Sequence, residues 1–296
     1  MRLIGIVVAC LGLIGCSSTD EEPGSVQPGV TVPGGPYQHK VLSASSIDGL
    51  NWARDQGVRI DHASVPCAVS DANRIILYYV DADRGPGLPE SVGCAVSQDG
   101  IQFQKQNFFI ENLAVTKAVD PSILRDQDGK YRLYYLASSV SGDPASDTLP
   151  HEIHLALSDD GIRFQSAGNV FRYAWLVDPD VFAYQGTWFM YVFSKNQTII
   201  ATSSDGKSFV YKQAMVPQGW GTVAPVVLDD GRLRLYAFDQ RTATGNAVRS
   251  FISSNGIDWV QEPGERLVGG KLEQITDPYV VRWKGSYKMY FKSDQR

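Results

Sequence analysis

The stretch Val177-Asp178-Pro179-Asp180-Val181-Phe182 returns in altered form four more times along the chain. Each copy is a short apolar run entered through an X-Pro pair, and a polar turn and a run rich in Tyr and Leu follow it. The other copies are Ser64-Val65-Pro66-Cys67-Ala68-Val69, Val119-Asp120-Pro121-Ser122-Ile123-Leu124, Val223-Ala224-Pro225-Val226-Val227-Leu228 and Thr276-Asp277-Pro278-Tyr279-Val280-Val281. Successive prolines are 55, 58, 46 and 53 residues apart. A period of about 50 residues with several short strands per unit is typical of a β-propeller.

A second motif, Ser-x-Asp-Gly or Ser-x-Asn-Gly, follows in register, with Phe or Trp three residues after its glycine. Its copies are Ser97-Gln98-Asp99-Gly100, Ser158-Asp159-Asp160-Gly161, Ser203-Ser204-Asp205-Gly206 and Ser253-Ser254-Asn255-Gly256. An Asp here can accept hydrogen bonds from the amides of its own turn. We therefore interpret Asp48, Asp99, Asp160 and Asp205 as structural. Within the second repeat we predict strands over residues 122–125, 131–137, 153–157 and 163–165.

The fifth repeat is incomplete, because only one more strand, 287–291, follows Thr276-Asp277-Pro278 before the sequence ends. Residues 39–45 can supply its third strand, and residues 46–52 its closing turn and fourth strand. The sequence therefore predicts an all-β, five-bladed β-propeller whose last blade is closed by strands from both termini. Such closure removes the open sheet edges that favour aggregation.

The first 16 residues contain one charge, Arg2, and an apolar run that ends in Leu13-Ile14-Gly15-Cys16. A charged start, a short apolar core and small residues before a cleavage point are typical of an export signal. The Leu-Ile-Gly-Cys ending resembles a bacterial lipobox, which implies cleavage before Cys16 and its lipidation; an ordinary signal peptide is the alternative. We expect a signal over 1–16, a flexible linker over 17–36 and the propeller over 37–296, anchored to the bacterial cell envelope and facing outside the cytoplasm.

The 296 residues are 43% hydrophobic and carry a net charge of −5. No basic stripe appears, so we expect no nucleic-acid partner, and the protein is expected to be a monomer. No run after the N-terminus reaches the length of a membrane span. Cys67 and Cys94 fall on strands two apart, roughly 9–10 Å from each other, whereas a disulfide needs Cα atoms within roughly 7 Å. Both are therefore predicted to be free, buried thiols.

The first strand of each repeat is expected to line the central axis, so the five residues before proline form a ring: Val65, Asp120, Asp178, Ala224 and Asp277. Carboxylates crowded in a narrow channel repel one another, and at least one should have a raised pKa. Such a group is a candidate general acid or base. The alternative is that Asp-Pro opens the strand and its carboxylate caps nearby amides. No cofactor is expected and no metal-ligand spacing is present, although a calcium ion in the acidic channel is an open alternative.

The segments that join the repeats bring further side chains to the same rim. Trp suits a sugar, whose apolar face stacks on the indole while its hydroxyls need polar partners. Trp175 and Trp220 lie in these segments. We therefore predict a carbohydrate partner, and the alternative is that the two tryptophans pack between blades. Glu152 is an additional candidate acid, or a solvated strand end. The candidate substrate-binding residues are Asp61, His62, Lys117, Trp175, Trp220 and Glu273.

These motifs, over residues 39–296, resemble the five-bladed propeller glycosidases of glycoside hydrolase family 43 and relatives in families 32, 117 and 130. Family 43 has an Asp base on the first blade, a pKa-setting Asp on the third and a Glu acid on the fourth. Asp178 matches the third-blade position, but Val65 and Ala224 stand at the other two. Two hypotheses remain: a surface-anchored glycoside hydrolase-like protein using Asp120, Asp178 and Asp277 with Glu152 as an outside acid, or a non-catalytic propeller lipoprotein that binds glycan or another surface partner.

Overall fold

The computed structural model describes residues 35–71, 73–86, 88–113, 117–138, 150–239, 247–271 and 273–295. These residues belong to one compact unit that spans Pro33–Arg296. The predicted signal, Cys16 and most of the predicted linker lie outside the described residues. None of the described residues belongs to a helix long and apolar enough to span a membrane.

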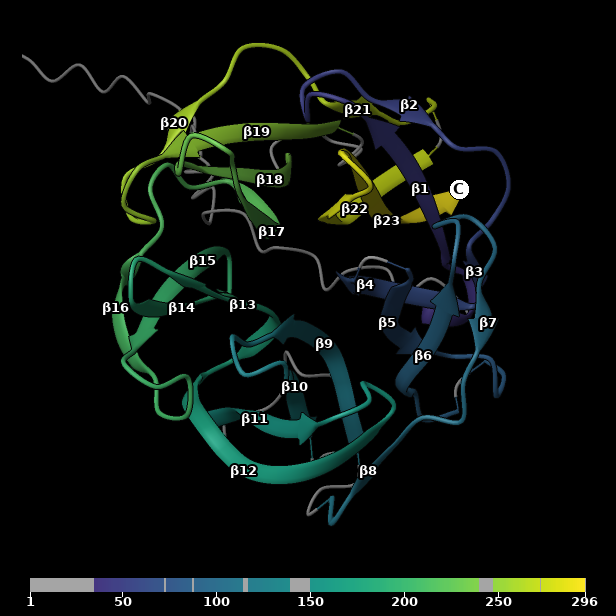
Figure 1. The fold of residues 1–296 in the computed structure, drawn as a ribbon, viewed down its shortest axis with the longest axis vertical. Coiled ribbons are helices and arrows are strands. Elements are labelled where there is room, and N and C mark those ends of the chain that lie inside the picture. Colours follow the sequence, from purple (N-terminus) through teal and green to yellow (C-terminus); the bar gives the residue numbers. More distant parts are fainter. Residues whose placement is uncertain are drawn as a thin grey trace, which may run out of the picture. The chain divides into compact units, whose positions relative to one another are not determined.

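Five sheets of mainly antiparallel strands surround a central axis, as the sequence predicted (Figure 1). The only helical element in the described ranges is a 3-10 turn, η1 (Gly35–Gln38). Blade 1 contains β4 (Ala63–Ser70), β5 (Ile75–Asp81), β6 (Ser91–Ser97) and β7 (Gln104–Lys105). Blade 2 contains β9 (Lys117–Arg125), β10 (Tyr131–Ser138), β11 (Pro150–Ser158) and β12 (Arg163–Ala174), with β8 (Phe109–Glu111) parallel to β12. Blade 3 contains β13 (Leu176–Tyr184), β14 (Thr187–Ser194), β15 (Gln197–Ser203) and β16 (Val210–Ala214). Blade 4 contains β17 (Trp220–Val227), β18 (Leu233–Asp239), β19 (Ala247–Ser253), β20 (Val260–Gln261) and β21 (Leu267–Val268).

Both ends of the described chain build blade 5, which confirms the predicted closure. Its inner strands β22 (Glu273–Trp283) and β23 (Ser286–Gln295) come from the C-terminal end, and β1 (Lys40–Ser46) adds the third strand. The short β2 (Ala53–Arg54) and β3 (Ile60–Asp61) pair with β1 on its outer side. Figure 1 shows the purple β1 beside the yellow β23.

The repeated Ser-x-Asp-Gly turns have the structural role that the sequence predicted. In the first of them, Asp99 Oδ1 accepts the N–H groups of Ile101 and Gln102, both at 2.8 Å. These bonds lower the pKa of Asp99 to about 2. Asp48, Asp160 and Asp205 make the same pair of contacts in their own turns.

Each of these turns also joins its blade to the blade before it in the ring, through a feature that the sequence analysis did not identify. The second strand of every blade carries a buried tyrosine whose hydroxyl donates to the carbonyl of the turn glycine in the next blade. The five bonds run from Tyr78 to Gly161 (2.5 Å), Tyr134 to Gly206 (2.7 Å), Tyr191 to Gly256 (2.6 Å), Tyr236 to Gly49 (2.8 Å) and Tyr290 to Gly100 (3.0 Å). We call them the tyrosine latches.

The hydrophobic core lies between adjacent blades in five clusters, each formed mainly by two neighbours. Tyr131, Leu133 and Ile123 of blade 2 pack with Ile76 and Cys67 of blade 1, for example. Because every blade meets two others in this way, burial of apolar surface is distributed around the whole ring. Cys67 and Cys94 are buried free thiols, as predicted.

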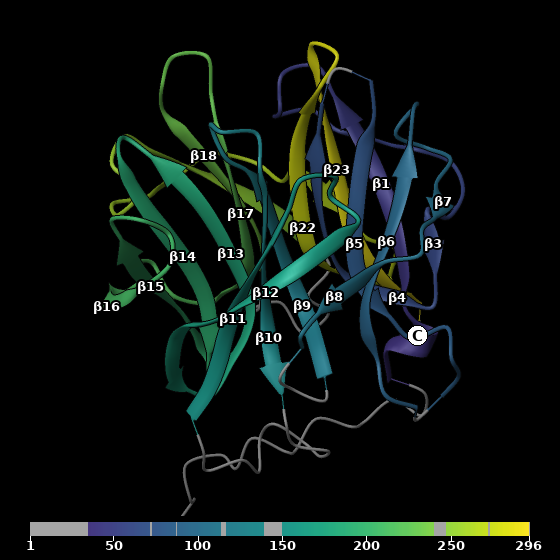
Figure 2. The same ribbon diagram turned by 60° about the horizontal axis from the view of Figure 1, so that its bottom comes forward.

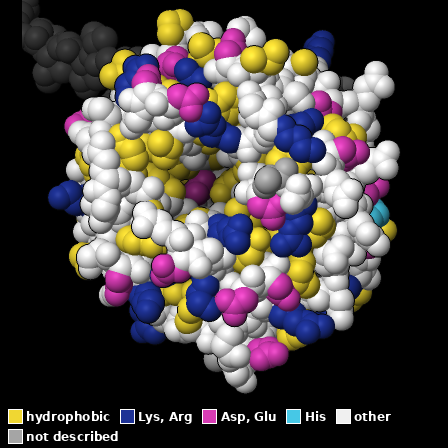
Figure 3. Space-filling view, viewed as in Figure 1, with side chains coloured by type: hydrophobic (Ala, Val, Ile, Leu, Met, Phe, Trp, Pro, Cys, Tyr) yellow, Lys and Arg dark blue, Asp and Glu magenta, His cyan; other side chains and the backbone are white. Residues whose placement is uncertain are grey.

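The inner strands all run from the rim that carries the inter-blade segments to the rim that carries the tight turns (Figure 2). The tight-turn face is hollowed at its centre, where an acidic side chain lies at depth among apolar and basic ones (Figure 3).

The observed strands extend beyond the predicted ones, because the prediction followed only the most apolar residues. In blade 2, β9 begins at Lys117 and β12 continues to Ala174.

Candidate functional site

A β-bulge at the start of the inner strands of blades 1, 2, 3 and 5 places one side chain from each at a common level of the axis. The residue before proline is in the left-handed region in all four: φ is 45° at Val65, 49° at Asp120, 51° at Asp178 and 52° at Asp277. A β-branched residue such as Val65 rarely adopts this conformation. Because Val65 shares it with the aspartates, the bulge is a property of the blade and not of the acidic residues alone.

The fourth blade departs from the predicted ring. Ala224 is paired with Tyr236, as Cys67 is with Tyr78 and Asp180 with Tyr191, so it lies one level below the aspartates. The ring position that we expected for Ala224 belongs to Thr222, two residues earlier. Its Oγ1 lies 2.9 Å from Asp277 Oδ1 and 3.3 Å from Asp178 Oδ2. The X-Pro pair misled the prediction, because in blade 4 the bulge precedes Val223 instead of containing Pro225.

The three predicted aspartates come together and form what we call the aspartate cluster (Asp120, Asp178 and Asp277). The backbone N–H of Asp178 is 3.4 Å from Asp120 Oδ2. Thr222 bridges the carboxyl groups of Asp178 and Asp277, and the two distances limit the separation of the bridged oxygens to at most 6.2 Å. Thr276 Oγ1 makes a further contact of 3.2 Å with Asp277.

A lysine that the sequence analysis missed provides the positive charge. Lys292 Nζ is 3.0 Å from Asp277 Oδ2, and Asp277 is 4% exposed. The charges of Asp277 and Asp178 keep the pKa of Lys292 above its usual value even though burial acts against this. A signal for it does exist in the sequence. Two residues after the latch tyrosine, the other second strands carry Val80, Leu136, Phe193 and Phe238, and only blade 5 carries a charge.

The members of the aspartate cluster differ in their affinity for a proton. Burial raises the pKa of Asp120 to about 6, reinforced by the charge of Asp277 and opposed by the hydrogen bond from Asp178. Burial and the negative charges of Asp120 and Asp277 raise the pKa of Asp178 well above its usual value. At neutral pH the arrangement therefore favours a protonated Asp178 beside an ionised Asp120.

The bridge through Thr222 fits this distribution of protons. A hydroxyl has one proton to donate, and Asp277 is the closer acceptor at 2.9 Å. The same hydroxyl lies 3.3 Å from Asp178 Oδ2, and once its proton is committed to Asp277 it can only accept at this second contact, which requires a proton on Asp178. The chain Asp178–Thr222–Asp277–Lys292 is thus satisfied when Asp178 carries the proton.

Below the aspartate cluster, Asp180 is a second acidic group at the axis. It is 5% exposed, and its Oδ2 has no hydrogen-bond partner among the described residues. Burial raises its pKa well above the usual value, which corresponds to a neutral carboxylic acid. Cys67 and Tyr279 lie close enough that the Asp180 charge, after burial, contributes to raising their pKa values.

Glu152, the predicted outside acid, and Glu273, a predicted substrate-binding residue, are both bound to cationic partners. Glu152 lies on the third strand of blade 2, where it binds His154 Nε2 at 2.8 Å and pairs with Arg172. The His154 hydrogen bond, aided by Arg172, lowers its pKa despite partial burial. Glu273 is buried and accepts from Arg54 at 2.9 Å and Ser293 at 2.7 Å. Burial opposes ionisation of Glu273, but these bonds and one from Gly270 outweigh it and lower its pKa.

The remaining rim residues divide into partly exposed and buried groups. Lys117 is half-buried and pairs with Glu90, and Trp175 is partly buried beside His151, with 6.5 Å between ring centroids. Asp61 is exposed, and His62 stacks on Tyr37 with 3.9 Å between centroids. Trp220 is 3% exposed and packs edge-on against Phe251. The packing alternative therefore holds for Trp220, whose indole offers no face to a sugar.

Within the described ranges, no group of three or more His, Cys, Asp or Glu side chains could hold a metal ion. Lys292 supplies the positive charge beside Asp277.

Similar solved structures share this fold. An α-L-arabinofuranosidase of family 43 from Clostridium thermocellum is 18% identical with a TM-score of 0.57, covering 77% of this chain and 81% of its own. A family 117 glycoside hydrolase from Zobellia galactanivorans is 13% identical with a TM-score of 0.53 over 78% of this chain and 84% of its own. A protein of unknown function from Dyadobacter fermentans is 16% identical with a TM-score of 0.58, and the match covers 87% of this chain and 84% of that protein. No protein-family model matches the sequence, and no match was found among curated proteins. At these identities the likeness establishes the five-bladed propeller.

Proposed function

We propose that this chain is a glycoside hydrolase-like protein that cleaves a poly- or oligosaccharide with the carboxyl groups of its aspartate cluster. The observation that carries the proposal is the unequal protonation of neighbouring carboxyl groups, with Asp178 protonated and Asp120 ionised. Hydrolysis of a glycosidic bond uses such a pair, one carboxylic acid and one carboxylate. The propeller glycosidases with the same fold support this choice of reaction.

In the proposed reaction Asp178 protonates the leaving oxygen of the glycosidic bond. Asp120 then acts as the carboxylate on the other side, either attacking the sugar or activating a water. Asp277 is a positioning residue: its charge, fixed by Lys292, keeps the proton on Asp178, and Thr222 orients the acid. This assignment differs from the family 43 resemblance, which implied a pKa-setting role for Asp178. Lys117 and Trp175 would contact the substrate from the rim.

The test is hydrolysis of a panel of 4-nitrophenyl glycosides, including the α-L-arabinofuranoside, and of neutral polysaccharides. Asp178→Asn keeps the size of the side chain but cannot supply the proton, so kcat/KM should fall by about 100- to 10,000-fold. Asp277→Asn should instead move the basic limb of the pH profile to lower pH, since it removes a charge that raises the pKa of Asp178. Full activity of Asp178→Asn would refute the assignment.

A non-catalytic glycan-binding propeller is the second candidate, and one observation favours it. Glu152 and Glu273 are both held in ion pairs, and so is Asp277, so few carboxylates remain for chemistry. In that case the panel would show no hydrolysis by the wild-type protein, while Asp178→Asn would lower stability and leave glycan binding in place.

The anchoring of the chain is a separate proposal, since it concerns residues outside the described ranges. We propose that Cys16 is lipidated and holds the protein on the bacterial cell envelope. Cys16→Ser should then move the protein from the detergent phase to the aqueous phase on Triton X-114 partitioning. Unchanged partitioning would overturn the anchor.

A further inference from the structure

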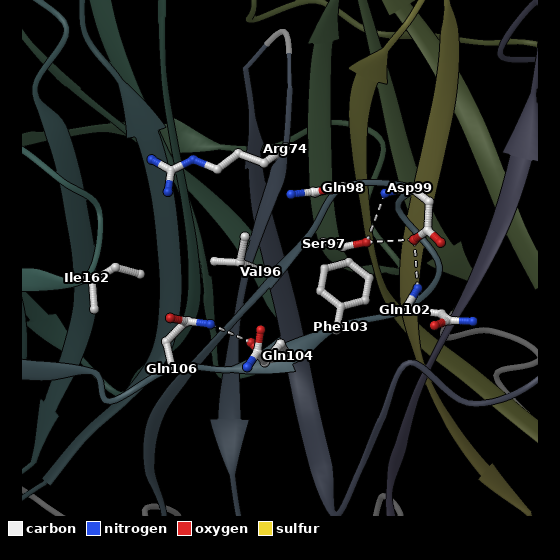
Figure 4. Close-up of a pocket in the computed structure, with 10 residues that line it drawn as sticks. All are labelled: Arg74, Val96, Ser97, Gln98, Asp99, Gln102, Phe103, Gln104, Gln106 and Ile162. Atoms are coloured by element: carbon white, nitrogen blue, oxygen red, sulfur yellow. Dashed lines mark hydrogen bonds between the residues drawn. The ribbon is translucent and has the colours of Figure 1, made fainter.

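A polar pocket lies on the side of the tight turns, at the outer edge of blade 1 and beside Ile162 of blade 2 (Figure 4). Its volume is about 620 Å³, within the range of roughly 300–1,000 Å³ that is common for ligand sites. Val96, Phe103 and Ile162 contribute its apolar surface, and the remaining lining is polar.

Glutamine amides dominate the polar lining. Gln102, Gln104 and Gln106 alternate along the outer edge of the blade, and Gln98 comes from the preceding turn. The side chains of Gln98, Gln102 and Gln104 are exposed and make no hydrogen bond to any described residue. Gln106 donates to the carbonyl of Gln104 at 2.9 Å. Three exposed amide groups therefore border the pocket with all their donors and acceptors available.

This arrangement is confined to blade 1. At the place of Gln102 and Gln104, blade 2 has Arg163 and Gln165, blade 3 has Ser208 and Val210, blade 4 has Asp258 and Val260, and blade 5 has Asn51 and Ala53. Since the blades share one architecture, the glutamines are not needed to build the turn. Their side chains also do not serve the turn, whose bonds to Asp99 come from the backbone amides of Ile101 and Gln102.

The pocket offers little free charge. Asp99 Oδ1 accepts the N–H groups of its own turn, and Arg74 is paired with Asp71 at 3.2 Å. An amide can donate and accept at the same time, as can a sugar hydroxyl. Apolar side chains beside such amides suit the two kinds of surface that a pyranose or furanose presents. An anionic ligand would find no unpaired cation among the lining residues, since Arg74 is their one cation and pairs with Asp71.

We propose that this pocket is a second carbohydrate-binding site, which holds a neutral segment of the polysaccharide away from the axis. The proposal rests on the proposed function for the identity of the polysaccharide. Because the pocket and the aspartate cluster lie at different places on the propeller, the pocket would hold a segment of the polysaccharide other than the one at the axis. Short substrates would use only the axial site.

The experiment compares Gln102→Ala/Gln104→Ala with the wild type and with Gln165→Ala. Gln165 occupies the place of Gln104 in blade 2 and is also exposed, but it does not line the pocket. Binding is measured by affinity gel electrophoresis with arabinan, xylan and, as a charged comparison, polygalacturonate. All variants are made on both the wild-type and the Asp178→Asn background, so that binding is read without turnover.

We expect the double variant to bind at least one neutral polysaccharide 5- to 10-fold more weakly, with Gln165→Ala unchanged and hydrolysis of short aryl glycosides unaffected. If neither the wild type nor any variant hydrolysed the glycosides, but the double variant still bound the polysaccharide more weakly than Gln165→Ala, the proposed function would be wrong and the second binding site would be supported. Equal binding by the double variant and Gln165→Ala, binding of polygalacturonate alone, or no binding to any of the three polymers would overturn the proposal.

Discussion

At the scale of single residues, the candidate site depends on the balance between the three carboxyl groups of the aspartate cluster and the one lysine beside them, Lys292. Asp120, Asp178 and Asp277 could be predicted because each precedes a proline in a repeated motif. Lys292 was missed because it lies on a second strand, and strand pairing brings it beside Thr276 and hence Asp277. Thr222 was missed because the bulge of blade 4 is displaced from its proline. Both are contacts between strands, which a motif on one strand does not reveal.

Replacing Lys292 tests this balance of charges. Lys292→Met keeps much of the apolar stem but leaves Asp277 buried without its partner, which should lower the free energy of unfolding by about 3 kcal/mol. Adding Asp277→Asn removes the unpaired charge and should restore part of that loss, giving a coupling energy above about 1 kcal/mol. Chemical denaturation of the two single variants and the double variant measures it. Additive losses would show that the ion pair has no energetic role.

At the scale of elements, the sequence predicted the number of strands and the turns better than the strand lengths. The Ser-x-Asp-Gly motifs marked their turns correctly, because the required contacts are local. The strand ends that carry Lys117 and Trp220 could not be placed from apolar pattern alone, since neighbouring strands hold them through backbone bonds. The tyrosine latches join different blades, so their partners became evident only in the fold.

Two adjacent tyrosines provide a matched test of the latches. Tyr78 and Tyr79 are both fully buried, but the Tyr78 hydroxyl binds the Gly161 carbonyl, whereas the Tyr79 hydroxyl has no partner among the described residues. Tyr78→Phe should lower the free energy of unfolding by about 1–2 kcal/mol, because it leaves a buried carbonyl unsatisfied. Tyr79→Phe should be neutral or stabilising, because it removes an unsatisfied hydroxyl. Thermal melts of the two variants compare them directly, and equal losses would contradict the latch.

At the scale of the whole molecule, the repeat spacing sufficed to predict five blades and a shared last blade. The forces that hold the shared blade closed could not be predicted, because they join residues more than 200 positions apart. Arg54 pairs with Glu273 at 2.9 Å, and Lys288 pairs with Asp55 at 3.1 Å. Asp55 also accepts hydrogen bonds from Ser43 and Ser45, both at 2.6 Å. The N-terminal strands are thus fixed to the C-terminal ones by carboxylates.

This chemistry predicts that acid opens blade 5 first. Burial opposes ionisation of Asp55 and Glu273, but their hydrogen bonds and ion pairs prevail and lower both pKa values. A carboxylate with a lowered pKa stabilises the fold above the unfolded-state pKa of about 4, and this contribution is lost as the pH falls through the folded value. The turn aspartates respond in the same direction, but they are distributed over the blades, whereas Asp55 and Glu273 act only on blade 5.

Hydrogen exchange at pH 7 and pH 3, corrected for the intrinsic rates, should therefore show a larger loss of protection in β1 than in β14 of blade 3. Asp55→Asn/Glu273→Gln should reproduce part of that selective loss at pH 7, because it removes the same charges without acid. Asp230→Asn is the matched control, since Asp230 also has a lowered pKa but pairs with Arg232 within an exposed turn of blade 4. If protection fell equally in β1 and β14 at pH 3, or if the double variant matched the control, the two ion pairs would not be what closes the ring.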